Sequence, residues 1–169
     1  MLKHLPEKWI HYLHDMISKC WSKGELPGVW KQSVVVPILK QGKRHVDVNS
    51  YRPIAVTSHS CKLMEKIILE RLIYYCDKNK IIPVNQAGFR SGRSTVDHLL
   101  NLSTNVKRQF ARRQSVLATF FDVKRAYDKV WHARLLYKLK TIGVSGHMYQ
   151  YIKSFISNGT IQTRVGHSY

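Results

Sequence analysis

The fold prediction depends most on the stretch "TFFDVKRAYDKVWH", residues 119–132. In this stretch an apolar segment leads directly into a carboxylate. Asp122 directly follows two phenylalanines, and Asp128 comes six positions later in a basic region. Two roles are open for Asp122. It is either a capping or salt-bridging carboxylate in an ordinary α/β domain, paired with Lys124 or Arg125, or it is a ligand of a metal ion.

The spacing of Asp122 and Asp128 argues against a metal site built from these two residues alone. On one extended strand, six steps of about 3.3 Å would separate them by about 20 Å, whereas paired metal ions lie only about 3.5 to 4 Å apart. On a helix, residue i+6 points away from residue i. Asp128 is therefore predicted to be the N-cap of a helix that Gly143 ends. Because residues 98–169 contain no third Asp or Glu, a complete metal site needs a carboxylate from upstream or from beyond that range.

The composition favours a folded chain with a polyanionic partner. A length of 169 residues and an apolar content of 44% are enough for one domain, or for part of a larger one. Lys and Arg number 28 against 10 Asp and Glu, which gives a formal net charge of +18. Nucleic acid is the leading partner for such a charge. An anionic membrane is disfavoured, because the basic residues are spread along the chain rather than grouped on one amphipathic face.

The cysteines and the N-terminus indicate an intracellular chain, in the nucleus or the cytoplasm. The three cysteines form no CxxC pair, which argues against both a disulfide framework and a zinc knuckle. The first residues, "MLKHLPEKWIHYLHDM", carry charges and no apolar core of a secretory signal. No apolar run reaches the roughly 18 residues that a membrane helix requires.

Hydrophobic periodicity predicts alternating helices and strands. The predicted helices cover residues 2–21, a segment with apolar residues from 63 to 72 that ends near residue 79, a helix that begins at Ser94, and residues 128–143 and 146–157. Three segments are predicted as strands: 29–39, 115–123 and 160–165. The segment 115–123, "SVLATFFDV", is typical of a buried strand. Pro37 is expected to keep the first strand at a sheet edge or to end it.

Two basic loops are candidates for phosphate contact. The loop "KQGKRHVDVNSYRP", residues 40–53, contains several Lys and Arg and no apolar core. The loop "NQAGFRSGR", residues 85–93, is punctuated by glycines and leads into an S-x-x-D capping pair, Ser94 and Asp97. Backbone N–H groups and guanidinium groups in such a loop are suited to binding phosphate.

Four segments, taken together, resemble consecutive blocks of a reverse transcriptase from a non-long-terminal-repeat, or LINE-type, retrotransposon. The blocks are "LPGVWKQSVVVPILKQGK" (26–43), "SYRPIAVTSHSCKLMEKIILERL" (50–72), "NQAGFRSGRSTVDHL" (85–99) and "TFFDVKRAYDKVWH" (119–132), in the family's order. The resemblance implies a mixed α+β fold that is part of a right-hand polymerase, with helical fingers and an incomplete palm sheet. It implies the following division: an N-terminal helical extension over 1–25, fingers over 26–114, and the incomplete palm over 115–169.

The resemblance also implies roles in the palm. Asp122 matches the first catalytic aspartate, which binds both Mg²⁺ ions in the complete enzyme. The main-chain oxygen of Val123 is expected to help hold the metal on the nucleotide side. Tyr127 matches the aromatic residue that lies under the sugar of the incoming nucleotide and excludes a 2′-hydroxyl.

Basic residues of the fingers have implied roles as well. Lys40 and Arg52 are expected to meet the incoming triphosphate, and Lys43 is an alternative to Lys40. Arg90 and Arg93 are expected to contact the phosphates of the template. Such contacts contribute affinity and salt dependence but no base specificity.

The implied partners are an RNA template, a DNA primer and deoxynucleoside triphosphates, without a membrane; the sequence carries no signal for an oligomeric state. The palm motif Tyr/Phe-x-Asp-Asp, which supplies the other metal-binding carboxylates of the family, has no counterpart in residues 1–169. The resemblance therefore implies that this chain alone does not polymerise DNA. A non-catalytic basic module that binds RNA or DNA is the alternative. An unrelated basic α/β protein with a coincidental "DVKRAYD" is a weaker one.

Overall fold

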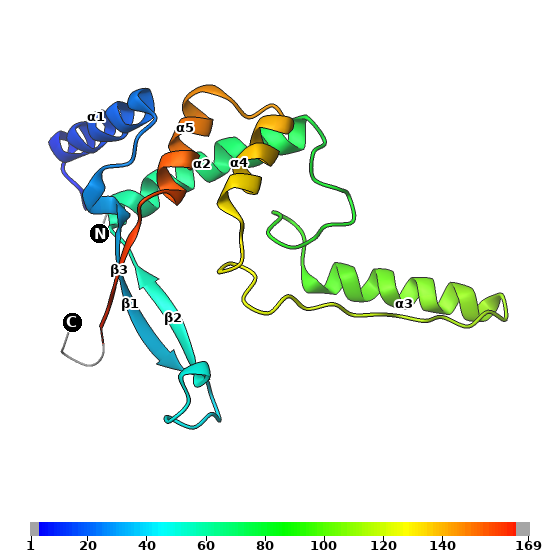
Figure 1. Cartoon of the computed structure of the whole chain (residues 1–169). Helices are drawn as coiled ribbons and strands as arrows, with labels where there is room; N and C mark the ends of the chain where they lie inside the picture. The colour runs from blue at the N-terminus through cyan, green and yellow to red at the C-terminus, as the bar shows by residue number, and fades with distance from the viewer. Residues whose placement is uncertain (1–3, 165–169) are drawn as a thin grey trace. The chain divides into compact units, whose positions relative to one another are not determined.

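The computed structural model describes residues 4–164, which fall into two compact units. The larger unit holds residues up to Leu72 and from Trp131 onward, and the smaller unit is Ile73–Val130. The elements along the chain are α1 (Glu7–Lys23), β1 (Gln32–Leu39), β2 (Tyr51–Val56), α2 (His59–Lys78), α3 (Thr95–Ala111), α4 (His132–Thr141), α5 (Gly146–Ile156) and β3 (Thr160–Thr163), as Figure 1 shows. The predicted α+β mixture is confirmed, whereas the division at residues 26 and 115 stays a prediction. None of the described helices combines the length and the apolar character needed to cross a membrane.

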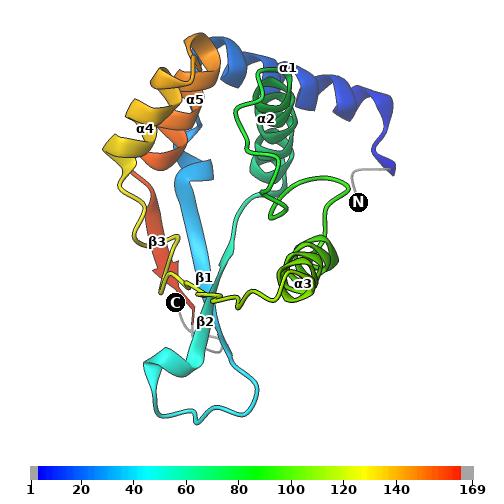
Figure 2. The same cartoon turned by 90° about the vertical axis from the view of Figure 1, so that its right-hand side faces the viewer.

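The sheet of the larger unit has the strand order β2-β1-β3 (Figure 2). β1 pairs antiparallel with β2 and parallel with β3. Pro37 lies opposite Pro53, and β3 reaches along β1 only as far as Val35. Within the described residues Pro37 therefore has a strand on one side only, as a residue without an N–H group requires. Both expectations for Pro37 are nevertheless wrong, because β1 is the central strand of the sheet and continues past Pro37 to Leu39.

β2 was not predicted, because residues 51–53 were assigned to the basic loop. The proline at position 53 argues against a strand when the sequence is considered alone. Since the residue opposite it is also a proline, that pair exchanges no backbone hydrogen bonds, and the ladder tolerates both.

The core of the larger unit lies between α1, α2 and α5. Its buried residues are Cys20, Leu26, Trp30, Cys61, Met64, Ile68 and Tyr151. Met64 is fully buried, and burying a side chain of this size contributes about 1.5–3 kcal/mol. The predicted α5 is confirmed within one residue, but its deepest side chain is Tyr151 rather than Phe155, which remains 44% exposed. Burial raises the pKa of the Cys61 thiol to about 12, and the hydrogen bond to Glu65, 3.1 Å away, acts in the same direction.

The ends of α1 follow from single residues. The helix begins at Glu7 instead of residue 2, because Pro6 is its N-cap and a proline excludes helical geometry from the residue before it. The first residues of the predicted helix, 2–3, lie outside the described part of the chain. Gly24 ends the helix as predicted, with a left-handed φ of 63°. A Cβ atom at Gly24 would lie 2.7 Å from Cβ of Gln150 on α5, so both backbone geometry and packing require glycine there.

Candidate functional site

The apolar segment before Asp122 does not form the predicted buried strand. Residues 114–123 have no regular secondary structure and are exposed, and the side chains of Phe120 and Phe121 are 81% and 90% exposed. A strand needs a neighbour for its backbone hydrogen bonds, and none of the described residues pairs with this segment. The prediction of a buried strand over residues 115–123 is therefore wrong for the described structure.

Asp122 and Asp128 lie in separate local structures. Asp122 lies near the end of the segment 114–123, which has no regular secondary structure, and is exposed. Asp128 lies within consecutive turns at residues 124–129, where the N–H of Lys129 donates to the carbonyl of Arg125 at 3.2 Å. The N-cap of α4 is Trp131, so the prediction that Asp128 caps this helix is wrong. The turns hold Asp128 before the helix begins, while the predicted stop at Gly143 is confirmed by its φ of 87°.

The donors near Asp122 suit a hard cation in part. Mg²⁺ takes oxygen ligands and is often held by one or two carboxylates together with water and substrate phosphates. An exposed carboxylate followed by the main-chain oxygen of Val123 offers ligands of this type. Among residues 4–164, no group of three or more His, Cys, Asp or Glu side chains is placed to hold a metal ion. Within residues 4–164, Asp122 and Val123 alone do not make a metal site. Tyr127, five residues after Asp122, has an exposed ring.

Lys40 and Arg52 lie in the hairpin formed by β1 and β2. The backbone N–H of Lys40 donates to the carbonyl of Ser50 at 2.8 Å, which continues the antiparallel ladder by one pair. Arg52 lies opposite Ile38, two residues before Lys40. Because side chains alternate along a strand, Lys40 and Arg52 lie on the same face of the hairpin. The hairpin thus brings together two cations that are separated by a loop in the sequence.

The loop of this hairpin fixes the ammonium group of Lys40. Lys40 Nζ donates to the carbonyl oxygen of Asn49 at 2.7 Å. Asp47 Oδ1 accepts from the backbone N–H of Asn49 at 2.8 Å, and the hydroxyl of Tyr51 donates to the carbonyl of His45 at 3.0 Å. An ammonium group has three donors, so Lys40 keeps donors for an anion while the loop determines where they lie.

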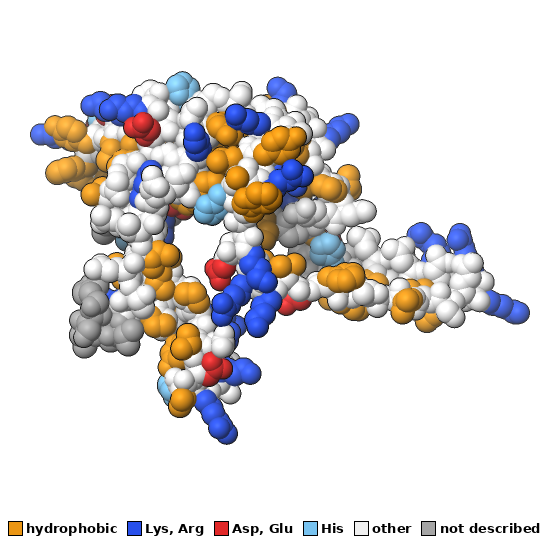
Figure 3. All heavy atoms as spheres, in the orientation of Figure 1, with side chains coloured by type: hydrophobic (Ala, Val, Ile, Leu, Met, Phe, Trp, Pro, Cys, Tyr) orange, Lys and Arg blue, Asp and Glu red, His pale blue; other side chains and the backbone are white. Residues whose placement is uncertain are grey.

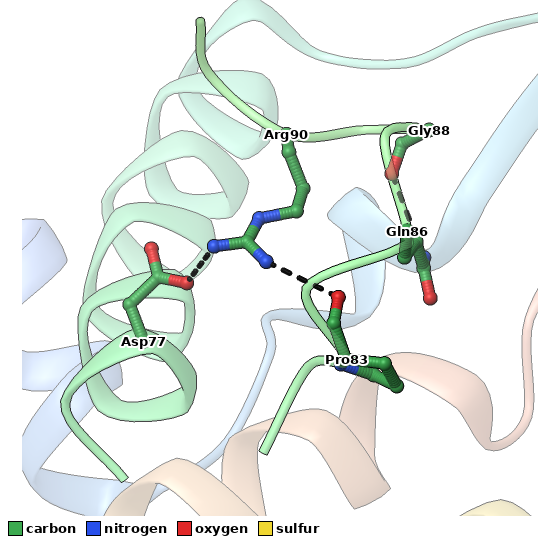
Figure 4. A network of polar contacts seen from close by, with 5 residues as sticks. All are labelled: Asp77, Pro83, Gln86, Gly88 and Arg90. Atoms are coloured by element: carbon green, nitrogen blue, oxygen red, sulfur yellow. Dashed lines mark hydrogen bonds and ion pairs between the residues drawn. The ribbon is translucent and has the colours of Figure 1, made fainter. Parts of the chain in front are cut away.

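In the smaller unit, Arg90 is bound within its own loop (Figure 4). Arg90 Nη2 lies 2.8 Å from Asp77 Oδ1, near the end of α2, and Nη1 donates to the carbonyl of Pro83 at 3.5 Å. The Arg90 side chain is only 23% exposed. Asp77 was not identified from the sequence, because nothing in the local pattern links residues 13 positions apart. The ion pair fastens the loop that follows α2 to the helix.

Two consecutive turns shape residues 87–93. The N–H of Arg90 donates to the carbonyl of Ala87 at 3.3 Å, and the N–H of Arg93 donates to the carbonyl of Arg90 at 3.4 Å. The third position of each turn has a positive φ: 59° at Phe89 and 69° at Gly92. Glycine is favoured at such a position, whereas a bulky side chain there costs about 1–3 kcal/mol. Phe89 is nevertheless 91% exposed, so its ring gains little burial in exchange.

The capping pair at the start of α3 is confirmed. The backbone N–H of Ser94 donates to Asp97 Oδ2 at 2.6 Å, and Ser94 Oγ lies 3.1 Å from the same oxygen. The hydrogen bond from the Ser94 backbone lowers the pKa of Asp97. The cap is therefore present above the ordinary pKa of an Asp and is lost as the pH falls through the lowered value. Arg93, just before this cap, is exposed.

The apolar face of α3 is exposed as well. Hydrophobic side chains line the visible surface of the helix in Figure 3, and none of its residues is buried. The large exposed hydrophobic residues of α3 are Val96, Leu99, Leu100, Leu102 and Phe110. Like the segment before Asp122, this face of α3 is apolar enough for a protein core. Within the described residues of the smaller unit, nothing buries it.

The predicted site residues are thus divided between the two units. The larger unit contains Lys40 and Arg52, and the smaller unit contains Arg90, Arg93, Asp122, Val123 and Tyr127.

Comparison with known proteins gives a consistent result. Residues 38–169 match the profile of the family described as reverse transcriptase (RNA-dependent DNA polymerase). The chain is 33% identical over 168 residues to the probable RNA-directed DNA polymerase from transposon BS of Drosophila melanogaster, covering 99% of this chain and 18% of that protein. It is 32% identical over 164 residues to the RNA-directed DNA polymerase from mobile element jockey of the same organism, covering 97% of this chain and 18% of that protein.

A more distant relative is the Retrovirus-related Pol polyprotein from type-1 retrotransposable element R2 of Popillia japonica. It is 25% identical over 144 residues, which cover 85% of this chain and 20% of that protein. The chain thus spans about a fifth of the length of these relatives.

Proposed function

We propose, because this chain belongs to the reverse transcriptase (RNA-dependent DNA polymerase) family, that it forms the fingers and the first half of the palm of an RNA-directed DNA polymerase. The resemblance to enzymes of non-long-terminal-repeat retrotransposons is confirmed by the mobile-element relatives. The observation that carries the proposal is the family match over residues 38–169, which includes Asp122 and both basic loops.

Enzymes of this family use a divalent metal, and we assign Asp122 and Val123 to its binding. Bound Mg²⁺ would supply positive charge that neutralises the negative charge on the oxygens of the five-coordinate phosphorus in the transition state of nucleotidyl transfer. The exposed Asp122 carboxylate is accessible to a hydrated cation and to substrate phosphates. The remaining carboxylates must come from another segment, because residues 122–123 provide only one side of the site. We therefore propose that this chain alone does not extend a primer.

The hairpin cations are assigned to the incoming deoxynucleoside triphosphate. Lys40 and Arg52 lie on one face of the hairpin, and a guanidinium group binds phosphate oxygens in a bidentate manner. Tyr127 is assigned to the sugar, where its ring would leave no room for a 2′-hydroxyl. The exposed Arg93 is assigned to the template phosphates. The assignment of Arg90 to the same phosphates is weakened by its ion pair with Asp77.

A second function is favoured by a different observation. The net charge of +18 suits a non-catalytic module that binds RNA or DNA, and such a module needs no complete metal site. Its binding would depend on salt but not on Mg²⁺ or on Asp122.

Binding of a deoxynucleotide separates the two functions. We expect the 169-residue chain, mixed with a DNA primer annealed to an RNA template, to retain the complementary deoxynucleoside triphosphate only when Mg²⁺ is present. Arg52→Ala should weaken this retention about tenfold or more, because a hydrogen-bonded contact between charged groups is lost. Equilibrium dialysis with labelled nucleotide measures it. Arg134→Ala, at an exposed arginine on α4 of the same unit, is the control and should change retention little. Retention that is indifferent to Mg²⁺ and to Arg52 would favour the non-catalytic module.

A further inference from the structure

Phe89 occupies a conformation that its side chain does not favour, at a place where its ring is not buried. Phe89 has a φ of 59° and occupies the third position of the turn from Ala87 to Arg90. In the next turn, from Arg90 to Arg93, the third position is occupied by Gly92. The side chain of Phe89 is 91% exposed, so packing inside the protein does not explain the aromatic residue. Strained backbone positions are concentrated at binding sites, because the surrounding structure holds a side chain where a ligand needs it.

The turn that carries Phe89 is fixed at both ends. Ala87 is buried, and Arg90 is held by the 2.8 Å ion pair with Asp77 and by the carbonyl of Pro83. The side chain of Gln86 donates to the carbonyl of Gly88 at 3.5 Å, which steadies the peptide just before the ring (Figure 4). Residues 88 and 89 therefore project from a loop whose base is tied to α2.

We propose that Phe89 stacks on an unpaired base of the single-stranded template, and that Asp77 and Arg90 are the positioning residues that hold its ring outward. This inference rests on the proposed function, because it names the part of the template that this loop contacts. Aromatic rings together with a positively charged surface bind single strands without sequence preference. Arg93 follows on an exposed turn and supplies the phosphate contact.

The role of Asp77 distinguishes positioning from direct binding by Arg90. If the guanidinium group of Arg90 bound phosphate itself, Asp77→Asn would remove a competing carboxylate and strengthen RNA binding. If the ion pair positions Phe89, Asp77→Asn weakens binding, and Phe89→Leu adds no further loss in the Asp77→Asn background. The two roles thus predict changes of opposite sign for one substitution.

Binding of a single-stranded RNA containing 2-aminopurine to the 169-residue chain tests the inference. Phe89→Leu and Phe89→Gly should each weaken binding about 5- to 150-fold, the range for loss of one base–aromatic stack, and should abolish the stacking-dependent change in fluorescence. Phe89→Gly removes the ring while it relieves the strained turn, so its loss of binding is not attributable to misfolding. Phe89→Trp should retain binding, and Val84→Ala, an exposed apolar residue of the same loop, should have no effect.

The salt dependence separates stacking from charge. Phe89 variants should leave the slope of log K against log salt unchanged, whereas Arg93→Gln should reduce it by about 0.7 for one lost phosphate contact to a single strand. Phe89→Leu and Phe89→Gly chains that bind as tightly as the unchanged chain would overturn this inference and leave the proposed function intact. Failure of the unchanged chain to bind RNA would overturn both. Tighter binding by Asp77→Asn would overturn the positioning role.

Discussion

Asp122→Asn, in the full polymerase to which we propose this segment belongs, is expected to lower the rate of primer extension by on the order of a thousandfold or more. The substitution replaces an anionic ligand by a neutral amide of nearly equal size, and charge neutralisation by a bound metal contributes several kcal/mol to the transition state of such reactions. Template binding should persist, because Asp122 is exposed and its replacement removes no packing contact of the core. Single-turnover extension of a labelled DNA primer on an RNA template measures the rate.

The matched control for this prediction is Asp128→Asn. Asp128 carries the same charge six residues away, but it lies in the turns at 124–129. We expect its substitution to change the rate only a few-fold. Equal losses in both variants would show that the rate depends on the local charge rather than on a ligand at residue 122.

Tyr127→Val is expected to reduce discrimination between deoxynucleotides and ribonucleotides by about 10- to 100-fold. The two substrates differ by one hydroxyl, and forcing an extra group of this size against a ring costs about 1–3 kcal/mol. Because the Tyr127 ring is exposed in the described structure, shortening it should leave the fold intact. The ratio of kcat/KM for a deoxynucleoside triphosphate to kcat/KM for its ribonucleotide measures the effect.

Tyr127→Phe should keep this discrimination, since the ring and its volume remain. Unchanged discrimination in Tyr127→Val would place the sugar elsewhere. An equal loss of kcat/KM for both nucleotides would indicate a general role in the palm instead of contact with the 2′ position.

Helices were predicted well because their signals are local. The repeat of apolar residues located α2 and α5 within a few positions, and Gly24, Gly143 and the Ser94–Asp97 pair ended or began helices as expected. The errors concern the first residues of two helices, where the local sequence moves the start of the helix. Pro6 delays the start of α1, and the turns at 124–129 keep Asp128 from capping α4.

Strands were predicted less well because they depend on partners. The strand β2 was not predicted, because Pro53 argues against a strand. Only the structure shows that Pro53 pairs with Pro37, where neither residue needs to donate a hydrogen bond. The segment 115–123 was predicted as a buried strand because its residues are mostly apolar. The strand does not form, because none of the described residues pairs with this segment. The apolar composition of a segment favours a buried strand, but the strand forms only when a neighbouring strand accepts and donates its backbone hydrogen bonds.

The candidate site could be predicted only residue by residue. The blocks of sequence located Lys40, Arg52 and Asp122, but the shared face of Lys40 and Arg52 follows from the hairpin register. The partner of Arg90 and the positive φ of Phe89 are properties of a folded loop, and no spacing rule relates Asp77 to Arg90. Arg90 is therefore part of the support of the loop, while Arg93 keeps its assignment to the template phosphates.

The dependence of primer extension on the metal ion, in Asp122→Cys, tests most directly whether residue 122 is a metal ligand. A thiolate prefers softer cations than a carboxylate does. We therefore predict little extension with Mg²⁺ and partial recovery with Mn²⁺ or Cd²⁺, whereas Asp128→Cys should keep its activity with Mg²⁺. Full activity of Asp122→Cys with Mg²⁺, or a cation preference that the substitution leaves unchanged, would contradict the account.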